Sequence, residues 1–335
     1  MLSPNHIKGG FFNPNEILKK ALFTGAFCCL SLTALHAQNF KSQIRITSDN
    51  DAYISRMKDR YYTNGASLKY THALNRDKIT NPNLAKKIIE IEGGQQIFNP
   101  YSATLKKSRP IDRPFTGYLF AGGSMNWLYK NESAIKVSAQ VGVIGPAALG
   151  KEVQSWFHSA FKLHEVKGWD YQLRNEPGLN ARFDYQRLLY RNASKWFDVT
   201  VSPSALLGNT FTGAQAGLQL RFGLLDKLFQ SAATNSRLSF GGDRHRKVEL
   251  YVYLTPQLNY VAYDATIEGG MFRNNKGPIT FGVQPFVYEQ KMGVQFATSR
   301  WSATYAVSLR TKEVQSRAAG SQYGSLSVGY SFDGL

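Results

Sequence analysis

Apolar and polar residues alternate with a period of two along most of this 335-residue chain. Such alternation is typical of β-strands with one apolar and one polar face, because successive side chains point to opposite sides of a strand. Three less regular segments, 42–48, 117–129 and 259–267, carry a weaker form of the pattern. The clearer segments, each predicted to form a strand, are 66–71, 136–143, 179–186, 199–206, 214–222, 248–256, 280–287, 292–298, 302–310 and 325–332.

The strand pattern predicts an all-β fold, specifically an antiparallel transmembrane barrel. A tilted strand needs about 10 residues to cross a bilayer, and about a dozen segments approach that length. Aromatic residues make up 13% of the chain, as expected of a barrel with rings at both membrane interfaces. A mean hydropathy of −0.32 fits strands whose inward side chains are polar. We therefore expect one outer-membrane β-barrel of about 12 strands, whose last strand ends at Phe332.

The first 37 residues have the features of an export signal. Two lysines precede an apolar run over 21–35, and small residues precede a cleavage point before Gln38. The run is too short to span a bilayer comfortably, so we expect cleavage. The barrel domain is then 38–335. Both cysteines of the chain lie in the signal, so the exported protein has no thiol and forms no disulfide.

The chain is strongly basic, with a net charge of +17. Nucleic acid is a common partner of such a chain, but export argues against it. Anionic headgroups of outer-membrane lipids, or phosphorylated glycolipids, are the partners that fit an exported barrel. A proteome that is basic throughout would also explain the charge without any function.

Two regions interrupt the alternation. The polar stretch Asn75–Arg109 predicts a long loop with one helical turn around Leu84–Ile91. The stretch Ala148–Phe161 has apolar residues at three-and-four spacing, which predicts a short amphipathic helix in a loop at the barrel mouth or inside the barrel. Gln154 and His158 lie four residues apart, a spacing that places both side chains on one face of that helix.

Several polar blocks could carry chemistry. His158 on its own is more simply a packed or interfacial side chain than a base. The acidic cluster 48–51 ends a predicted strand and suits a hard cation, which prefers oxygen ligands. Each of the other blocks can be explained by structure alone, as a turn, as tight packing of glycines or as an exposed ion pair.

Together and in order, these blocks resemble the lipid A 3'-O-deacylase family of Gram-negative outer membranes. The C-terminal half of the chain matches only as barrel strands. The motifs that carry the resemblance are Asn-Asp at 50–51, Asp-Arg-Tyr-Tyr-Thr-Asn-Gly at 59–65, Asp-Arg-Pro-Phe-Thr-Gly at 112–117, Val-Gly-Val-Ile-Gly-Pro at 141–146, Glu-Val-Gln-x-x-x-His at 152–158 and Gly-Trp-Asp-x-Gln at 168–172.

The resemblance implies a twelve-stranded barrel and a calcium-dependent hydrolase similar in mechanism to secreted phospholipase A2. It implies that His158 is the general base that activates water and that Gln154 lies beside it. Asp51 would help to hold Ca²⁺, Asn50 would help to bind the oxyanion, and Thr63 would line the site.

The resemblance also implies the substrate. A lysine before the Arg-Pro segment would contact a phosphate of lipid A, and that lysine is Lys107, or Lys106 if the gap moves. The expected reaction is removal of the 3'-linked acyl or acyloxyacyl chain from lipid A in lipopolysaccharide, at the outer membrane.

The chemistry implied is coherent. Ester cleavage builds negative charge on the carbonyl oxygen, which a divalent cation and an amide donor stabilise by several kcal/mol in a site poor in water. A neutral imidazole can take the proton from water. The chain has no Gly-x-Ser-x-Gly elbow, in agreement with direct attack by water.

Two alternatives remain open on the sequence. A phospholipase acting on glycerophospholipid would use the same base and cation with a different pocket. A porin or structural barrel would use neither, and His158 would then only fill the mouth.

Overall fold

The structure is a computed structural model. The predicted signal, residues 1–37, and the two candidate phosphate-binding lysines, Lys106 and Lys107, lie outside the described residues. The description covers residues 40–54, 60–75, 79–101, 111–160, 162, 166–240 and 245–333.

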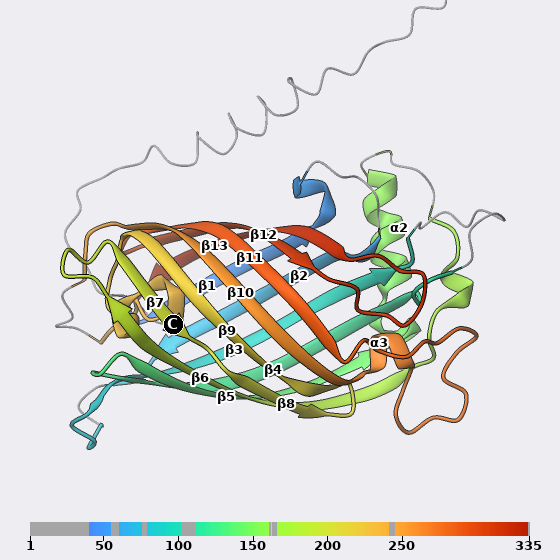
Figure 1. The fold of residues 1–335 in the computed structure, drawn as a ribbon, viewed down its shortest axis with the longest axis horizontal. Helices are drawn as coiled ribbons and strands as arrows, with labels where there is room; N and C mark the ends of the chain where they lie inside the picture. Colours follow the sequence, from blue (N-terminus) through green and yellow to red (C-terminus); the bar gives the residue numbers. More distant parts are fainter. Residues whose placement is uncertain are drawn as a thin grey trace, which may run out of the picture. The chain divides into compact units, whose positions relative to one another are not determined.

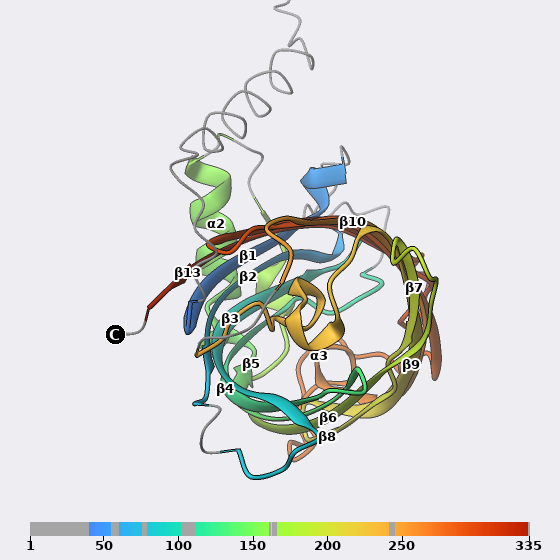
Figure 2. The same ribbon diagram turned by 90° about the vertical axis from the view of Figure 1, so that its left-hand side faces the viewer.

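The described chain forms one closed antiparallel barrel (Figures 1 and 2). The first strand pairs with the last along its whole length, from Ser42 opposite Phe332 to Asn50 opposite Gly324, and this pairing closes the cylinder. The strands are β1 (Ser42–Asn50), β2 (Tyr61–Ala73), β3 (Leu84–Asn99), β4 (Thr116–Tyr129), β5 (Ser133–Ile144), β6 (Glu176–Arg191), β7 (Phe197–Val201), β8 (Ser204–Gly208), β9 (Phe211–Leu224), β10 (Glu249–Asp264), β11 (Phe286–Ala297), β12 (Trp301–Arg310) and β13 (Ser321–Phe332).

These thirteen strands of the described chain occupy twelve positions in the wall. Strands β7 and β8 both pair with β6 on one side and with β9 on the other, so they are two halves of one strand. The break falls at Ser202 and Pro203, and proline cannot donate a ladder hydrogen bond. The predicted barrel of about 12 strands, ending at Phe332, is confirmed.

The wall has an apolar outer face and a polar inner face. Outward residues such as Ile46, Leu68 and Val141 are 62%, 56% and 58% exposed. Inward residues form ion pairs, for example Lys69 with Glu92 at 3.2 Å. A lipid-facing barrel requires this division, because hydrocarbon cannot solvate charges. No helix in the described part of the chain has the length and apolar character needed to cross a membrane.

The described helical segments are short and lie mostly at the barrel ends. The end that carries α2 also collects long connections, including 145–175 and 265–285, whereas the end that carries both termini of the barrel has tight turns such as 130–132 and 298–300. We call these the α2 end and the terminal end. The helical segments are η1 (Asp51–Ile54), η3 (Pro146–Ala148), α2 (Gly150–Ala160), η4 (Trp169–Tyr171), η5 (Leu228–Gln230), η6 (Ala232–Thr234) and α3 (Ala265–Glu268).

The one long connection described at the terminal end, 225–248, turns into the barrel (Figure 2). Its backbone carbonyls at Ser236 and Leu238 accept hydrogen bonds from the ammonium group of Lys86 on β3. The buried Arg221 of β9 donates to Ser231 of the same connection. We call this connection the plug, because its described residues fill the bore from the terminal end.

The other end of the bore is also filled. Arg113 is only 1% exposed and donates to Thr266 Oγ1 at 2.9 Å. An apolar cluster from β2, α3 and the loops before β11 and β13 packs beside it, formed by Tyr61, Ile267, Val283, Val314 and Ala318.

The predicted loop over Asn75–Arg109, with a helical turn at Leu84–Ile91, is wrong for its central part. Leu84–Asn99 is β3, sixteen residues long. Ile88 faces the bore, yet it is fully buried and packs with Leu128 and the plug residue Phe229. An apolar residue on the inner face masks the alternation, so the sequence pattern did not indicate a strand.

Two other strand predictions are wrong in their boundaries. The segment 259–267 is not a separate strand, because β10 continues through Pro256 to Asp264 and then enters α3. The segment 280–287 is largely loop, and β11 begins only at Phe286. Two predicted strands thus have no separate counterpart, and one observed strand, β3, was not predicted. These errors partly cancel, so the predicted number of strands is close to the observed number.

Candidate active site

The candidate site lies on the outer face of the wall at the α2 end. Asn50 of β1 pairs with Asn64 of β2, Asn64 pairs with Ile97 of β3, and Ile97 pairs with Gly117 of β4. These four residues therefore form one row across four strands. Asn50 lies an even number of residues from the lipid-facing Ile46, so its side chain shares the outer face. We call this set the outer row.

Thr63 occupies an irregular place beside the outer row. The pairing of β2 with β3 skips it, running from Tyr62 opposite Phe98 to Asn64 opposite Ile97. Thr63 is thus the extra residue of a β-bulge, a feature that re-aims side chains and is common next to active sites. It is 1% exposed, and within the described residues its Oγ1 makes no hydrogen bond.

The bulge places Tyr62 on the inner face of the wall. Its hydroxyl donates to Asp49 Oδ2 over 2.6 Å, passing above Gly65. A Cβ atom built on Gly65 would lie 2.1 Å from the Tyr62 hydroxyl oxygen, so only glycine leaves room for this bond. In the motif Tyr-Thr-Asn-Gly, the threonine forms the bulge, the tyrosine bonds to β1 on the inner face, and the glycine leaves room for the tyrosine hydroxyl.

The loop between β5 and β6 folds back onto the outer face. Gly117 allows close contact, because a Cβ there would lie 3.1 Å from the backbone nitrogen of Gly150 at the start of α2. The buried indole of Trp169 packs on Phe115 and Ile97. Glycine at 117 and 150 and an aromatic residue at 169 therefore fix α2 against β4 and β3.

Helix α2 crosses the strands outside the barrel (Figures 1 and 2). It contacts β4 and β3, and its first residue lies on Gly117 of β4. Eight residues separate Gly150 from His158, about 12 Å of helix, which spans about two and a half strand spacings of ~4.8 Å. The helix direction therefore carries His158 from β4 toward β2 and β1, where Thr63 and Asn50 lie.

The buried side of α2 is the polar one. Gln154 and His158 are 3% and 4% exposed, whereas the apolar Val153 and Trp156 are 37% and 68% exposed. Trp169 Nε1 donates to Gln154 Oε1 at 3.1 Å, which fixes the carboxamide one turn before His158. The predicted helix and the common face of the two residues are confirmed. The helix lies outside the wall (Figures 1 and 2), so the alternative position inside the barrel is wrong.

Asn50 and Asp51 end β1. The side-chain oxygen of Asn50 accepts the backbone N–H of Ala52 at 2.7 Å and thereby orders the first turn of η1. With that oxygen engaged, the group that Asn50 can offer a ligand is its amide N–H donor. Asp51 is 4% exposed, an unusual degree of burial for a carboxylate.

These groups fit a hard cation in their chemistry. The carboxylate of Asp51 and the hydroxyl of Thr63 are oxygen ligands of the type that Ca²⁺ prefers. They come from the facing ends of β1 and β2, and Thr63 Oγ1 is buried without a hydrogen-bond partner in the described chain. Among the described residues, no three His, Cys, Asp or Glu side chains are grouped so that they could hold a metal ion, so further ligands would be carbonyls, hydroxyls or water.

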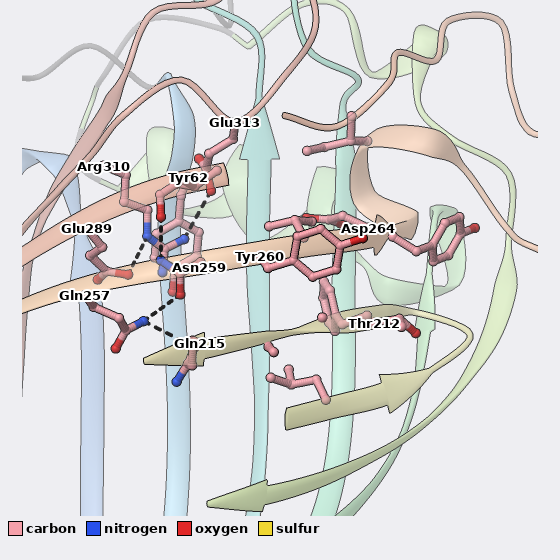
Figure 3. Close-up of a pocket in the computed structure, with 18 of the residues that line it drawn as sticks. Tyr62, Thr212, Gln215, Gln257, Asn259, Tyr260, Asp264, Glu289, Arg310 and Glu313 are labelled. Carbon is pink, nitrogen blue, oxygen red and sulfur yellow. Dashed lines mark hydrogen bonds and ion pairs between the residues drawn. The ribbon is translucent and has the colours of Figure 1, made fainter. Parts of the chain in front are cut away.

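The barrel also has an internal cavity of about 470 Å³ (Figure 3). Arg310 lies in it and forms ion pairs with Glu289 at 3.0 Å and Glu313 at 3.3 Å. Asp49 and Tyr62 line the same cavity from β1 and β2. The cavity lies on the opposite side of the wall from the outer row and belongs to the inner network behind it.

The structure thus brings the predicted residues into two groups. Asn50, Asp51 and Thr63 lie at the adjoining ends of β1 and β2, and Gln154 and His158 lie on the wall-facing side of α2. Trp169 and Tyr62 support these groups. Both stand inside motifs visible in the sequence, although their contacts could not be inferred from it.

The fold and the site define an outer-membrane type of barrel with a polar cluster on the outside of its wall. A family model described as "Outer membrane protein LpxR" matches residues 22–332, and the chain belongs to this family. The protein is accordingly an outer-membrane β-barrel of the LpxR type, with its longer loops expected to face outside.

The fold is similar to that of a solved outer-membrane protein. LpxR from Salmonella typhimurium superposes with a TM-score of 0.69 at 22% identity, covering 87% of this chain and 100% of that one. The β domain of the Bordetella autotransporter BrkA gives a TM-score of 0.45 at 10% identity, covering 88% of this chain and 100% of that one. No curated protein sequence matches the chain.

Proposed function

We propose that the protein is a calcium-dependent esterase that removes the 3'-O-linked acyl or acyloxyacyl chain from lipid A. The observation that carries the proposal is the arrangement on the outer wall. A polar helix face with His158 and Gln154 lies against β3 and β4, and the neighbouring strands β2 and β1 carry Thr63 and Asn50 at the same end of the wall, with Asp51 directly after β1. An ester of an outer-leaflet lipid would meet these groups from the membrane side.

In this proposal His158 removes a proton from the attacking water. Its burial keeps the ring on the wall-facing side of α2 and away from bulk solvent. A positioned imidazole of this kind contributes on the order of a hundredfold to ten-thousandfold to the rate. Gln154, held by the Trp169 indole, lies one turn away and orients the bound ester or water.

Asn50 stabilises the negative charge that develops on the carbonyl oxygen. Its side-chain oxygen already accepts the backbone N–H of Ala52, so its side-chain NH2 group is the part that can donate to a ligand. Loss of one such donor typically costs about 3 kcal/mol of transition-state stabilisation. Asp51 and Thr63 would hold Ca²⁺, which when bound supplies Lewis-acid polarisation of the same oxygen.

The substrate class follows from charge and location. The chain has a net charge of +17, and lipid A carries phosphates at the surface of the outer leaflet. Lys107, or Lys106, is the expected phosphate contact. A porin is a poorer explanation, because the plug and the residues packed around Arg113 occupy part of the described bore at both of its ends.

The experiment uses the purified full-length barrel in detergent. Lipid A and a glycerophospholipid are each incubated with the protein, with Ca²⁺ or with a chelator, and the products are resolved by mass. The proposal expects release of the 3'-linked chain from lipid A only when Ca²⁺ is present. Release from glycerophospholipid alone would identify a phospholipase, and solute flux through liposomes without any hydrolysis would identify a pore.

A further inference from the structure

Helix α2 has three distinct sides. Gln154 and His158 form the buried side against the wall. At about 100° per residue, Val153 and Trp156 fall together on a second side, and Lys151, Ser155 and Ser159 fall on a third. The second side is exposed and apolar, with Trp156 at 68%, and the third is exposed and polar.

The apolar side of α2 faces the lipid-covered part of the wall. Just before the helix, the carbonyl of Ala148 accepts a hydrogen bond from Gln95 of β3 at 2.5 Å. Gln95 pairs with Leu119, one row closer to the middle of the barrel than the outer row. Helix α2 runs from β4 across β3 (Figures 1 and 2). In a right-handed helix with this direction and with Gln154 and His158 against the wall, positions 153 and 156 fall on the outward side and toward that row.

Apart from Gln95, which bonds the carbonyl of Ala148, the residues named beside this apolar side are apolar and lead into the lipid-facing belt. Leu119 on β4 is 38% exposed, and Leu68 on β2 and Val141 on β5 are 56% and 58% exposed. Leu68 and Val141 stand in one row, separated by Gly93 and Ala121. The apolar surface of the membrane-spanning wall thus extends up to the side of α2 that carries Val153 and Trp156.

We infer that Val153 and Trp156 bind the acyl chain of the lipid whose ester is cleaved. The inference rests on the proposed function. An ester held near His158 has its sugar on the polar side of α2 and its chain on the membrane side, where the exposed side chains of α2 are Val153 and Trp156. An exposed indole two residues before the base is otherwise unfavourable in water, and hydrocarbon gives it a partner.

The first test measures hydrolysis in detergent micelles, where no leaflet is present. Glucosamine phosphate bearing a 3-O-myristoyl or a 3-O-butyryl ester is the probe. Trp156→Ala should lower kcat/KM for the myristoyl ester on the order of tenfold, because a hydrophobic contact typically discriminates by 10- to 200-fold, and change the butyryl ester by less than about twofold. Val153→Ser should act in the same direction.

Two matched controls separate chain contact from damage to the fold. Trp301→Ala removes an indole that is 50% exposed at the terminal end of the barrel, and Ser155→Ala alters the polar side of α2. Both should retain the wild-type ratio of myristoyl to butyryl rates. An equal loss on both esters in Trp156→Ala, or an unchanged ratio, would overturn the inference.

A binding measurement separates this inference from the proposed function. In a His158→Ala background, a myristoyl ester brominated along its chain should quench tryptophan fluorescence, and Trp156→Phe should remove most of that quenching. Quenching with no hydrolysis by the wild-type protein would support the chain contact and contradict the esterase. Quenching that survives Trp156→Phe would contradict the chain contact even if the wild-type protein is an esterase.

Discussion

Tyr62 donates a hydrogen bond to Asp49 across the inner face of the wall, with 2.6 Å between Oη and Oδ2. Each partner is the immediate sequence neighbour of a candidate site residue, since Asp49 precedes Asn50 and Tyr62 precedes Thr63. Alternate residues of a strand point to opposite faces. The bond therefore lies behind the outer row and ties together the two strand ends that bear the site.

The Tyr62→Phe substitution tests this support. The ring still fills its place between Phe98 and Tyr323, but the bulge loses its tie to β1. We expect kcat to fall about fivefold, equivalent to a net hydrogen bond of about 1 kcal/mol, with the barrel still folded. Tyr253→Phe, in another buried tyrosine of the barrel, should leave kcat unchanged. An unaltered kcat in Tyr62→Phe would remove the positioning role.

Calcium dependence should change with Asp51. Replacing Asp51 by Asn keeps the shape of the side chain and removes its charge, so a hard cation should bind more weakly. The expected result is at least a tenfold increase, as an order of magnitude, in the Ca²⁺ concentration that gives half-maximal hydrolysis. Asp170→Asn is the control, because its side chain is 90% exposed. Equal calcium curves for wild type and Asp51→Asn would exclude Asp51 as a ligand.

The stability of the terminal end depends on a buried ion pair. Asp198 on β7 accepts two hydrogen bonds from Arg221 on β9, at 2.9 Å and 2.7 Å, and neither side chain is exposed. Asp198→Asn removes the charged group that accepts two hydrogen bonds from the buried Arg221 and leaves Arg221 with Glu249 at 3.7 Å. Breaking a buried pair in this way costs about 3–5 kcal/mol. The temperature at which the folded band is lost in gel migration should fall clearly, while hydrolysis at low temperature persists.

The Asp184→Asn variant provides the comparison for that experiment. Asp184 also pairs with an arginine, Arg182, but the two side chains are 22% and 37% exposed. Because solvent screens this pair, its loss should cost about 1 kcal/mol or less. Equal destabilisation by the two variants would show that burial is not what makes the Asp198 pair important.

The plug should loosen in mild acid. Burial, and next the charge of Arg237, lower the pKa of His245 below its ordinary value of about 6.5. The neutral ring is thus preferred in the folded state, so its stabilising effect is present above pH 6.5 and is lost as pH falls through the lowered pKa. Backbone amides of the plug should exchange their hydrogens faster as the pH falls below the lowered pKa of His245. The His245→Gln variant should show a weaker pH dependence of this exchange. The same pH dependence in the variant and in the wild-type protein would show that His245 is not responsible.

The sequence predicted the barrel because lipid on one side and a polar bore on the other impose a strict alternation. It failed at β3 for a specific reason. Ile88 faces the bore but is covered by Phe229 of the plug, which is about 140 residues away in sequence. Where a distant segment supplies an apolar partner on the inner face, local pattern alone does not identify the strand.

The sequence likewise predicted only part of the candidate site. The four-residue spacing correctly placed Gln154 and His158 on one face of α2, because helix geometry is local. The side that is buried could not be predicted, since Val153 and Trp156 are the more apolar residues. Their exposure depends on where α2 lies against the wall, and that position is set by contacts at Gly117 and Trp169.

The central claim is tested most directly by the mass of lipid A extracted from cells that carry no protein, the wild-type protein or the His158→Ala variant. Wild type should yield lipid A that is lighter by the 3'-linked acyl or acyloxyacyl chain. His158→Ala should yield the unmodified mass while still migrating as a folded barrel. Identical lipid A masses in all three strains, or full conversion by His158→Ala, would contradict the account.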